Sequence, residues 1–128
     1  MNEITDPRYW VEVAEEDLET ARVALKRKRP LLRAACFNSQ QCVEKYLKAI
    51  LVSRKHKFPK IHDLRELATL CEQAGILVPI DGTALERLSI FAVEVRYPGF
   101  PFDLSDAREA IATAKRVRQF ARKTLGLK

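Results

Sequence analysis

Hydrophobic residues recur at helical spacing along the chain, and the central stretch Ala34–His56 shows this pattern most clearly. An α-helix turns by about 100° per residue, which places apolar residues three and four apart on the same face. In this stretch the helical rotation places eight apolar residues on one broad face, with Ser39 in its middle. Its members are Ala35, Cys36, Cys42, Val43, Tyr46, Leu47, Ala49 and Ile50. A long helix with so wide an apolar face is typical of the centre of a bundle.

The opposite side of the same helix is polar but not uniformly so. Its polar residues are Asn38, Gln41, Glu44, Lys45 and Lys48, and Phe37 and Val52 interrupt them. This side is too apolar for a plain solvated face and too polar for a core. We therefore expect it to be covered by a second copy of the chain, a partner or a ligand.

Two further helices are predicted around this one. Asp6 followed by Pro7 is the expected start of a first helix, whose inward positions share a helical period. They are Trp10, Ala14, Leu18, Ala21 and Leu25, and the acidic outer face is expected to hold Glu12, Glu15, Glu16 and Glu19. Pro30 separates this helix from the central one, which is predicted to end near Lys57. His62-Asp63-Leu64 opens a third helix that stops at Gly75.

The remaining third of the chain predicts two more helices. Thr83 and Glu86 have capping-box spacing, and the helix they would start is apolar nearly all round, which favours burial between neighbours. The aromatic segment 96–103 that follows is expected to pack against the bundle. Asp103 or Ser105 should cap a last helix with Leu104 on its core side, ending at Gly126. Residues 1–128 thus predict one all-α domain, an antiparallel up-and-down bundle of about five helices.

Composition narrows the class of protein. Hydrophobic residues make up 47% and charged residues 31%, as in ordinary globular domains. The formal charge of +6 permits an acidic partner such as RNA. The three cysteines are widely spaced and predict a reduced cytoplasmic setting rather than a disulfide framework. No apolar run approaches the ~20 residues of a membrane span, and the amino-terminal residues carry no secretory signal core.

The residues indicate no metal or cofactor chemistry. Cys36 and Cys42 point about 240° apart on one helix, so they cannot chelate one ion, and His56 and His62 flank a turn without a clear third ligand. Buried structural cysteines are the favoured interpretation. No glycine-rich phosphate loop occurs. We therefore predict no catalytic metal and no cofactor.

An anion-binding face is a candidate on the central helix. Gln41, Lys45 and Lys48 share one face, and Arg96 at a helix end offers a planar charged fork that suits phosphate. The competing interpretation is an exposed face with a Glu44–Lys48 pair worth only ~0.3–0.5 kcal/mol. The basic tail from Lys115 to Lys128 is a second candidate for RNA, whereas Lys26–Arg29 are expected mainly to complement a helix dipole.

Taken together, these motifs resemble the HEPN family, the higher-eukaryote and prokaryote nucleotide-binding domains. The resemblance rests on residues 14–18, the block Cys36–Ala49 (CFNSQQCVEKYLKA), His62-Asp63-Leu64 and Arg96-Tyr97-Pro98. It is closest to the small stand-alone prokaryotic members, with Asn38 where His is common and Cys42 where Ala is common.

The resemblance implies a dimeric helical bundle with a groove near its two-fold axis. Members include nucleotide binders, partners of minimal nucleotidyltransferases in toxin–antitoxin pairs, and metal-independent RNases. The RNases carry Arg followed four to six residues later by His, but no His follows Arg96 in this sequence. RNase activity is therefore not the leading expectation, because the general acid–base imidazole is missing from its place.

The leading hypothesis is a cytoplasmic, homodimeric, non-catalytic module that binds nucleotide or RNA phosphate beside a nucleotidyltransferase partner. The expected ligand-binding residues are Gln41, Lys45, Lys48, Arg96 and Tyr97. Glu44, His62, Asp63 and Pro98 are expected to be structural or motif residues. The alternatives are an RNase that uses Arg96 with His62, and a protein-interaction module without a ligand.

Overall fold

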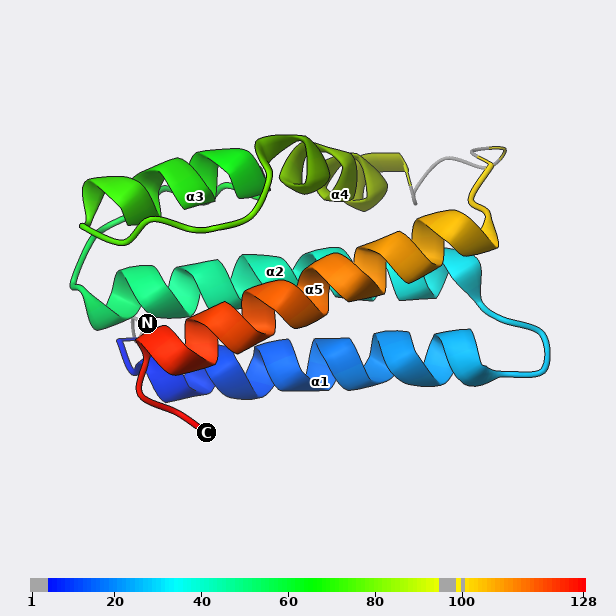
Figure 1. The fold of residues 1–128 in the computed structure, drawn as a ribbon, viewed down its shortest axis with the longest axis horizontal. Coiled ribbons are helices and arrows are strands. Elements are labelled where there is room, and N and C mark those ends of the chain that lie inside the picture. Colours follow the sequence, from blue (N-terminus) through cyan, green and yellow to red (C-terminus); the bar gives the residue numbers. More distant parts are fainter. Residues whose placement is uncertain (1–4, 95–98, 100) are drawn as a thin grey trace.

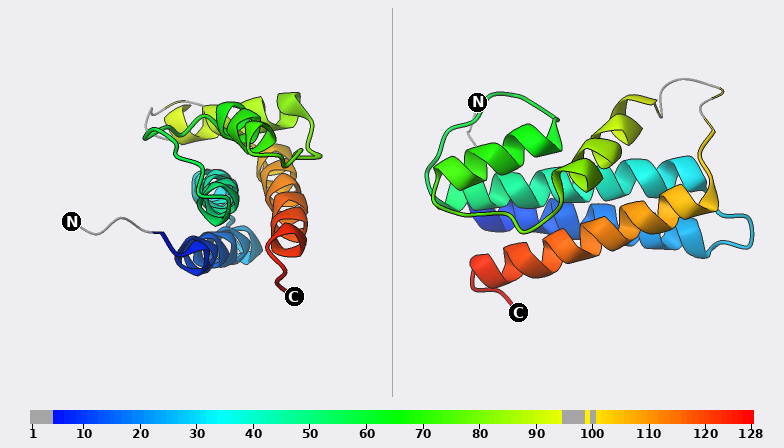
Figure 2. Two further views of the ribbon diagram at one scale, coloured as in Figure 1. Left: turned by 90° about the vertical axis from the view of Figure 1, so that its left-hand side faces the viewer. Right: turned by 45° about the horizontal axis from the view of Figure 1, so that its top comes forward.

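Helix α2 (Leu32–Ser53) lies at the centre of the molecule and contacts each of the other four helices. The structure is a computed structural model that describes residues 5–94, 99 and 101–128. Within those residues the chain forms five helices and no strand, in the order α1 (Pro7–Lys26), α2, α3 (Leu64–Gln73), α4 (Gly82–Glu94) and α5 (Leu104–Thr124). Seen along the bundle, α2 has α1 on one side, α5 on a second and the layer of α3 and α4 on a third (Figures 1 and 2).

The broad apolar face predicted for the central helix is confirmed. All eight of its apolar residues are fully buried, and Ser39 is buried among them, donating a hydrogen bond to the carbonyl of Ala35 at 2.7 Å. The same core includes Ala14, Leu18 and Ala21 of α1 and a row of small residues on α5. Because most positions of α1 and α5 that face α2 are alanine, these helices approach α2 closely.

Helix α2 ends at Ser53, several residues before the predicted end near Lys57. Arg54 caps the helix, and Lys55 has a φ of 54°, in the left-handed region that a helix cannot continue through. The amide of His56 then donates to the carbonyl of Leu51 at 2.9 Å, which closes the turn. The chain reverses here without the proline or glycine that the prediction relied on.

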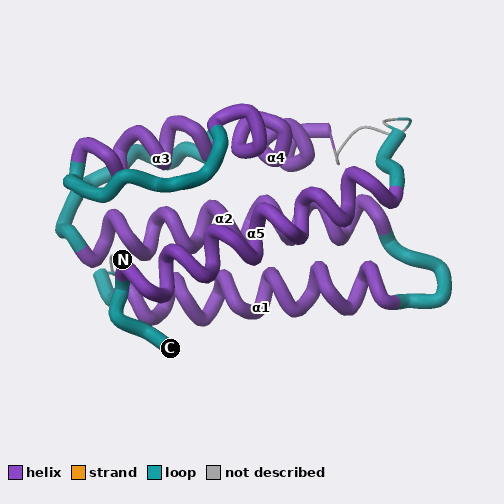
Figure 3. Tube along the Cα trace, viewed as in Figure 1, coloured by secondary structure: helices purple, strands orange, loops and turns teal. Residues whose placement is uncertain are grey.

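The connection 54–63 runs back along α2 rather than away from it (Figure 3). Phe58 lies against Lys48, and His62 lies against Glu44. The connection therefore contacts α2 in antiparallel order. Helix α3 consequently starts beside the middle of α2 and runs in the same direction, with Cys71 Sγ near the carbonyl of Leu47. This connection positions the candidate site.

The helix starts follow local capping chemistry, with one correction. Asp6, Asp63 and Asp103 cap α1, α3 and α5, each accepting a backbone N–H in the first turn. The predicted Thr83–Glu86 capping box is wrong: Asp81 accepts the amide of Thr83, and Glu86 instead pairs with Arg65 at 2.6 Å. An aspartate two residues earlier satisfies the free amides better than the threonine hydroxyl.

Two predictions about the faces of the later helices are also wrong. Helix α4 is not enclosed all round, because Ile90 and Val93 are about half exposed although Leu88 and Phe91 are buried. Leu104 is 38% exposed and does not line the core side of α5. Phe102, by contrast, packs on Phe91 with ring centres 5.5 Å apart, as expected for the end of the aromatic segment.

Candidate functional site

A buried carboxylate lies at the centre of the polar side of α2. Glu44 is 1% exposed, and its two oxygens accept hydrogen bonds or ion pairs from four side chains. The Lys48 ammonium lies 3.0 Å from Oε2 and the Lys45 ammonium 3.3 Å from the same oxygen. Nδ1 of His62 lies 2.9 Å from Oε1, and the Gln40 amide donates to that oxygen at 3.3 Å. We call this group, with Gln41, the Glu44 cluster.

The balance of charge in the cluster keeps Glu44 ionised. Burial raises the pKa of its carboxyl, but the charge of Lys45 and the hydrogen bonds from His62 and Lys48 outweigh that effect and lower the pKa below its usual value. A buried carboxylate with this many partners is satisfied within the chain.

The sequence predicts an outside cover for the polar side of α2, but the chain itself covers much of it. Lys48 is only 8% exposed, and its ammonium lies 5.9 Å from the ring centre of Trp10 and 5.7 Å from that of Phe58. These two rings meet edge to face at 6.2 Å. The interpretation of an exposed, weakly paired Glu44–Lys48 face is therefore wrong.

Gln41 and Lys45 form the outer layer of the cluster. Lys45 is 19% exposed, and its ammonium donates to Oε1 of Gln41 at 3.1 Å as well as to Glu44. The Gln41 amide donates in turn to Oε1 of Gln40 at 2.6 Å. An ammonium has three donors, and the described part of the chain supplies acceptors for two of those of Lys45. The structure thus brings together Gln41, Lys45 and Glu44, as the spacing predicts.

Asp17 of α1 lies at the edge of this cluster. Burial is the main cause that raises its pKa, to about 6, while the charge of Lys45 acts in the opposite direction. One of its carboxylate oxygens, Oδ2, is buried and has no hydrogen-bond partner within the described part of the chain. Sequence reasoning missed Asp17, Trp10 and Phe58, because only the packing of α1 and the 54–63 connection brings them to α2. It also missed Gln40, which lies on α2 itself and is buried beside Glu44.

The predicted site residues at the end of α4 cannot be placed. Arg96, Tyr97 and Pro98 lie outside the described residues. Asp63 is the N-cap of α3, as expected for a structural residue, and accepts the amide of Glu66 at 3.1 Å. His62, also expected to be a structural or motif residue, links the surface to the core, because its side chain is 71% exposed while Nδ1 contacts the buried Glu44.

A second polar group joins three helices on another side of α2. Glu15 was expected on the outer face of α1, but it accepts hydrogen bonds from the hydroxyl of buried Tyr46 and from Nε of Arg118, the latter at 2.6 Å. Arg122 lies 3.4 Å from the Tyr46 hydroxyl and donates from Nε to the carbonyl of Lys128 at 2.7 Å. Arg118 and Arg122 are therefore used inside the chain, which weakens the case for the tail as an RNA-binding patch.

The cysteines are suited to packing rather than to nucleophilic chemistry. All three are buried and none forms a disulfide. Burial raises the pKa of Cys36 and of Cys71 to about 12. Cys42 shifts in the same direction for the same reason. The thiolate, which is the reactive form, is strongly disfavoured at neutral pH. Among the described residues, no group of three His, Cys, Asp or Glu side chains could hold a metal ion.

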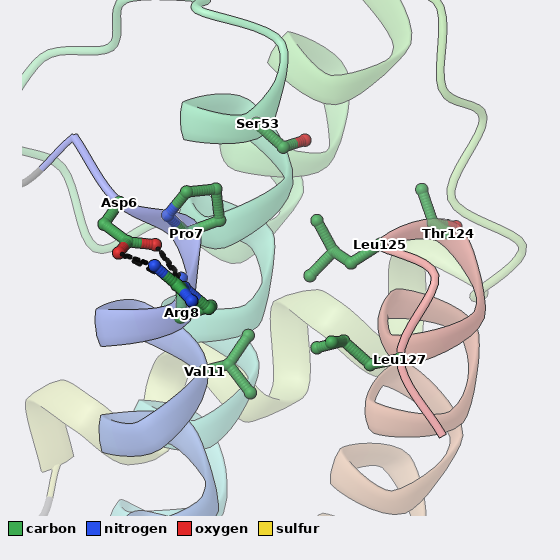
Figure 4. A pocket seen from close by; sticks show the side chains of 8 residues that line it. All are labelled: Asp6, Pro7, Arg8, Val11, Ser53, Thr124, Leu125 and Leu127. Carbon is green, nitrogen blue, oxygen red and sulfur yellow. Dashed lines mark hydrogen bonds and ion pairs between the residues drawn. The ribbon is translucent and has the colours of Figure 1, made fainter.

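Two hollows in the surface lie away from the Glu44 cluster. One, of about 350 Å³, lies at the end of the bundle between the start of α1 and the end of α5, with Val11, Leu125 and Leu127 as its apolar wall (Figure 4). The other, of about 570 Å³, lies between residues 30–34 and residues 101–102. Neither hollow is lined by Gln41, Lys45 or Lys48.

Comparison with known proteins supports the sequence resemblance. The family model described as HEPN domain matches residues 7–124. Among solved structures, the chain is similar to the crystal structure of ST0689, an archaeal HEPN homologue, with 26% identity, a TM-score of 0.67, and coverage of 93% of this chain and 97% of that one. No curated protein matches the sequence. Within the described residues, no helix is long and apolar enough to span a membrane.

Proposed function

The chain belongs to the HEPN domain family, and from this premise we propose that it is a non-catalytic member that binds a nucleotide or an RNA phosphate. The observation that carries the proposal is the Glu44 cluster. In it two lysine ammonium groups share one buried carboxylate, and Lys45, which is partly exposed, uses two of its three donors within the described residues. A phosphate oxygen is a strong hydrogen-bond acceptor, and a lysine ammonium binds it as a compact positive charge.

The roles of the two lysines differ in this proposal. Lys45 and Gln41 are partly exposed and contact the ligand directly. Lys48 is covered by Trp10 and Phe58, so it acts by holding Glu44 in place. The proposal keeps Arg96 and Tyr97 as ligand-binding residues on the strength of the family resemblance and of the guanidinium charge.

Calorimetric titration with adenosine 5′-monophosphate tests the site. We expect Lys45→Ala and Arg96→Ala each to weaken binding, by about 1.5–3 kcal/mol for Arg96, the range for hydrogen bonds to charged groups. Lys115→Ala, an exposed change of the same charge on α5, is the control and should leave the affinity unchanged. If Lys45→Ala and Arg96→Ala bind like the unaltered protein, or if the nucleotide does not bind at all, the site assignment is wrong.

An RNase that uses His62 is the second candidate, and one observation favours it. The exposed His62 imidazole is held through Nδ1 by a buried carboxylate, the arrangement that orients the general base in hydrolases. The second ring nitrogen, Nε2, is then the one that could exchange a proton with a substrate. RNA cleavage that His62→Ala abolishes would favour this candidate over the non-catalytic one.

The partners are part of the same proposal. We propose a cytoplasmic homodimer that acts with a minimal nucleotidyltransferase, and the half-exposed Ile90 and Val93 of α4 support an apolar interface. A specific dimer should bury on the order of 1,200 Å² or more. Sedimentation that shows a monomer at tens of micromolar protein would contradict the dimer. A nucleotidyltransferase reading frame beside this one would support the pair over a ligand-free interaction module.

A further inference from the structure

The connection between α2 and α3 is the most basic exposed segment beside the candidate site. From Lys45 to His62 the sequence contains six Lys and Arg residues and no Asp or Glu. Four of these, Arg54, Lys55, Lys57 and Lys60, lie in the connection and are exposed. We call these four the connection cations.

The connection cations are not neutralised within the described part of the chain. None of them forms an ion pair there, whereas other exposed arginines do: Arg65 pairs with Glu86, and Arg87 with Glu109. Arg54 and Lys55 follow the carboxyl end of α2, where positive charge complements the helix dipole. That effect fades within one turn, so it does not account for Lys57 and Lys60.

The backbone that carries these cations is held against the bundle. Phe58 packs on Trp10, His62 contacts Glu44, and the amide of Ile61 donates to the carbonyl of Pro59 at 2.9 Å. A polyanion that bound here would therefore meet side chains on a backbone that is already placed, with a smaller ordering cost than a free loop would impose.

Aromatic rings lie next to the connection cations. Tyr9 is 47% exposed, its ring centre is 6.0 Å from that of Trp10, and Trp10 in turn meets Phe58 of the connection. Surfaces that bind single-stranded nucleic acid combine a positive track for the phosphates with aromatic side chains on which bases stack. Duplexes offer no unstacked base to such rings.

We propose that the connection cations and Tyr9 form a binding surface for single-stranded RNA, which extends the Glu44 cluster along the molecule. This inference rests on the proposed function, because both assign a phosphate ligand to this side of α2. The two proposals differ in the length of the ligand and in the residues that bind it. The Glu44 cluster binds one nucleotide, whereas the connection cations and Tyr9 bind the phosphates that follow it and one base.

The chain provides a matched control. The chain has four other exposed cations, Lys26 at the end of α1 and Arg27, Lys28 and Arg29 in the α1–α2 connection. They lie at the opposite end of the bundle, with no aromatic residue among them (Figure 1). Changing either set of four to Gln removes the same charge. A purely long-range effect of net charge would therefore weaken RNA binding equally in the two variants.

Fluorescence anisotropy with a labelled single-stranded RNA of about 12 nucleotides, a length within the usual range of site sizes, measures the effect. If four phosphates are contacted, the affinity of the unaltered protein should fall about 50-fold between about 50 and 200 mM salt. The variant of the connection cations should bind weakly and with a flatter salt dependence, and the Lys26–Arg29 variant should bind like the unaltered protein. Tyr9→Leu should lose on the order of tenfold in affinity.

The results that would overturn the inference are specific. Equal loss in the two four-residue variants, or equal affinity for a duplex of the same length, would show attraction by net charge alone. RNA binding that is lost in Lys45→Ala but kept in the connection variant would contradict this surface and leave the proposed nucleotide site intact. If the protein does not bind the nucleotide but its RNA binding depends on the connection cations, the proposed nucleotide site is wrong and this surface is supported. Thermal unfolding of each variant confirms that the exposed changes preserve the fold.

Discussion

Nδ1 of His62 lies 2.9 Å from a carboxylate oxygen of Glu44, although the histidine side chain is 71% exposed and the glutamate 1%. This contact ties the end of the α2–α3 connection to the middle of α2. It also links the surface to a buried cluster of charge.

Glu44→Gln should destabilise the fold by about 3–5 kcal/mol, because it leaves the buried Lys48 ammonium without its counter-charge. The free energy of unfolding in urea measures the change. Glu12→Gln, on the exposed face of α1, is the matched control and should change stability by no more than about 0.5 kcal/mol. Equal stabilities of the two variants would mean that the ion pairs of Glu44 add nothing to the fold.

Asp17 should make the protein more stable as the pH falls from about 7 to about 5. Its folded pKa of about 6 lies above the usual value of an unfolded aspartate, so between those values the folded state binds the proton first. Asp17→Asn should remove this part of the pH dependence, which unfolding titrations at several pH values detect. An unchanged slope in the variant would contradict the raised pKa.

At lower pH the sign reverses because of Glu44. Its folded pKa is lowered, so the stabilisation it provides is present above the pKa of an unfolded glutamate and is lost as the pH falls through the folded value. We therefore expect a stability maximum in mildly acidic solution. Unfolding experiments on Glu44→Gln should show a weaker acid-side loss than the unaltered protein shows.

Tyr46→Phe should cost about 1.5–3 kcal/mol, because the buried hydroxyl donates to the ionised carboxylate of Glu15. Tyr9→Phe makes the same chemical change at a half-exposed tyrosine and serves as the control. Denaturant unfolding compares the two variants. A loss of equal size at both positions would indicate that the bond to Glu15 is not the cause.

The three cysteines should resist a thiol reagent in the native protein at pH 8 and react on unfolding. Burial disfavours the thiolate of each, with the pKa of Cys36 and Cys71 raised to about 12. Counting the reacted thiols with and without denaturant tests this. Rapid native labelling of any of the three would show that the site is open to solvent.

Much of the fold could be predicted from hydrophobic spacing, because a helix that buries one face must show it in its sequence. The five helices, the buried face around Ser39 and the caps at Asp6 and Asp63 all follow from local patterns. The end of α2 could not be predicted in this way, because Lys55 adopts a left-handed conformation without the glycine that usually marks it.

The candidate site was less predictable, for a physical reason. Helical spacing places Gln41, Glu44 and Lys45 on one side of α2, but it cannot show what covers that side. The covering residues, Trp10 and Phe58, come from α1 and from a connection with no periodicity of its own. Long-range pairs such as Glu15 with Arg118 are likewise set by packing between helices distant in sequence.

We propose that this HEPN member binds RNA phosphate and does not cleave the RNA. One incubation of the purified protein with end-labelled single-stranded RNA tests it most directly, when half of the sample is run on a native gel and half on a denaturing gel. We expect a shifted band on the native gel and intact RNA on the denaturing gel. Shortened RNA whose formation is abolished by His62→Ala, or RNA that stays both unshifted and intact, would contradict it.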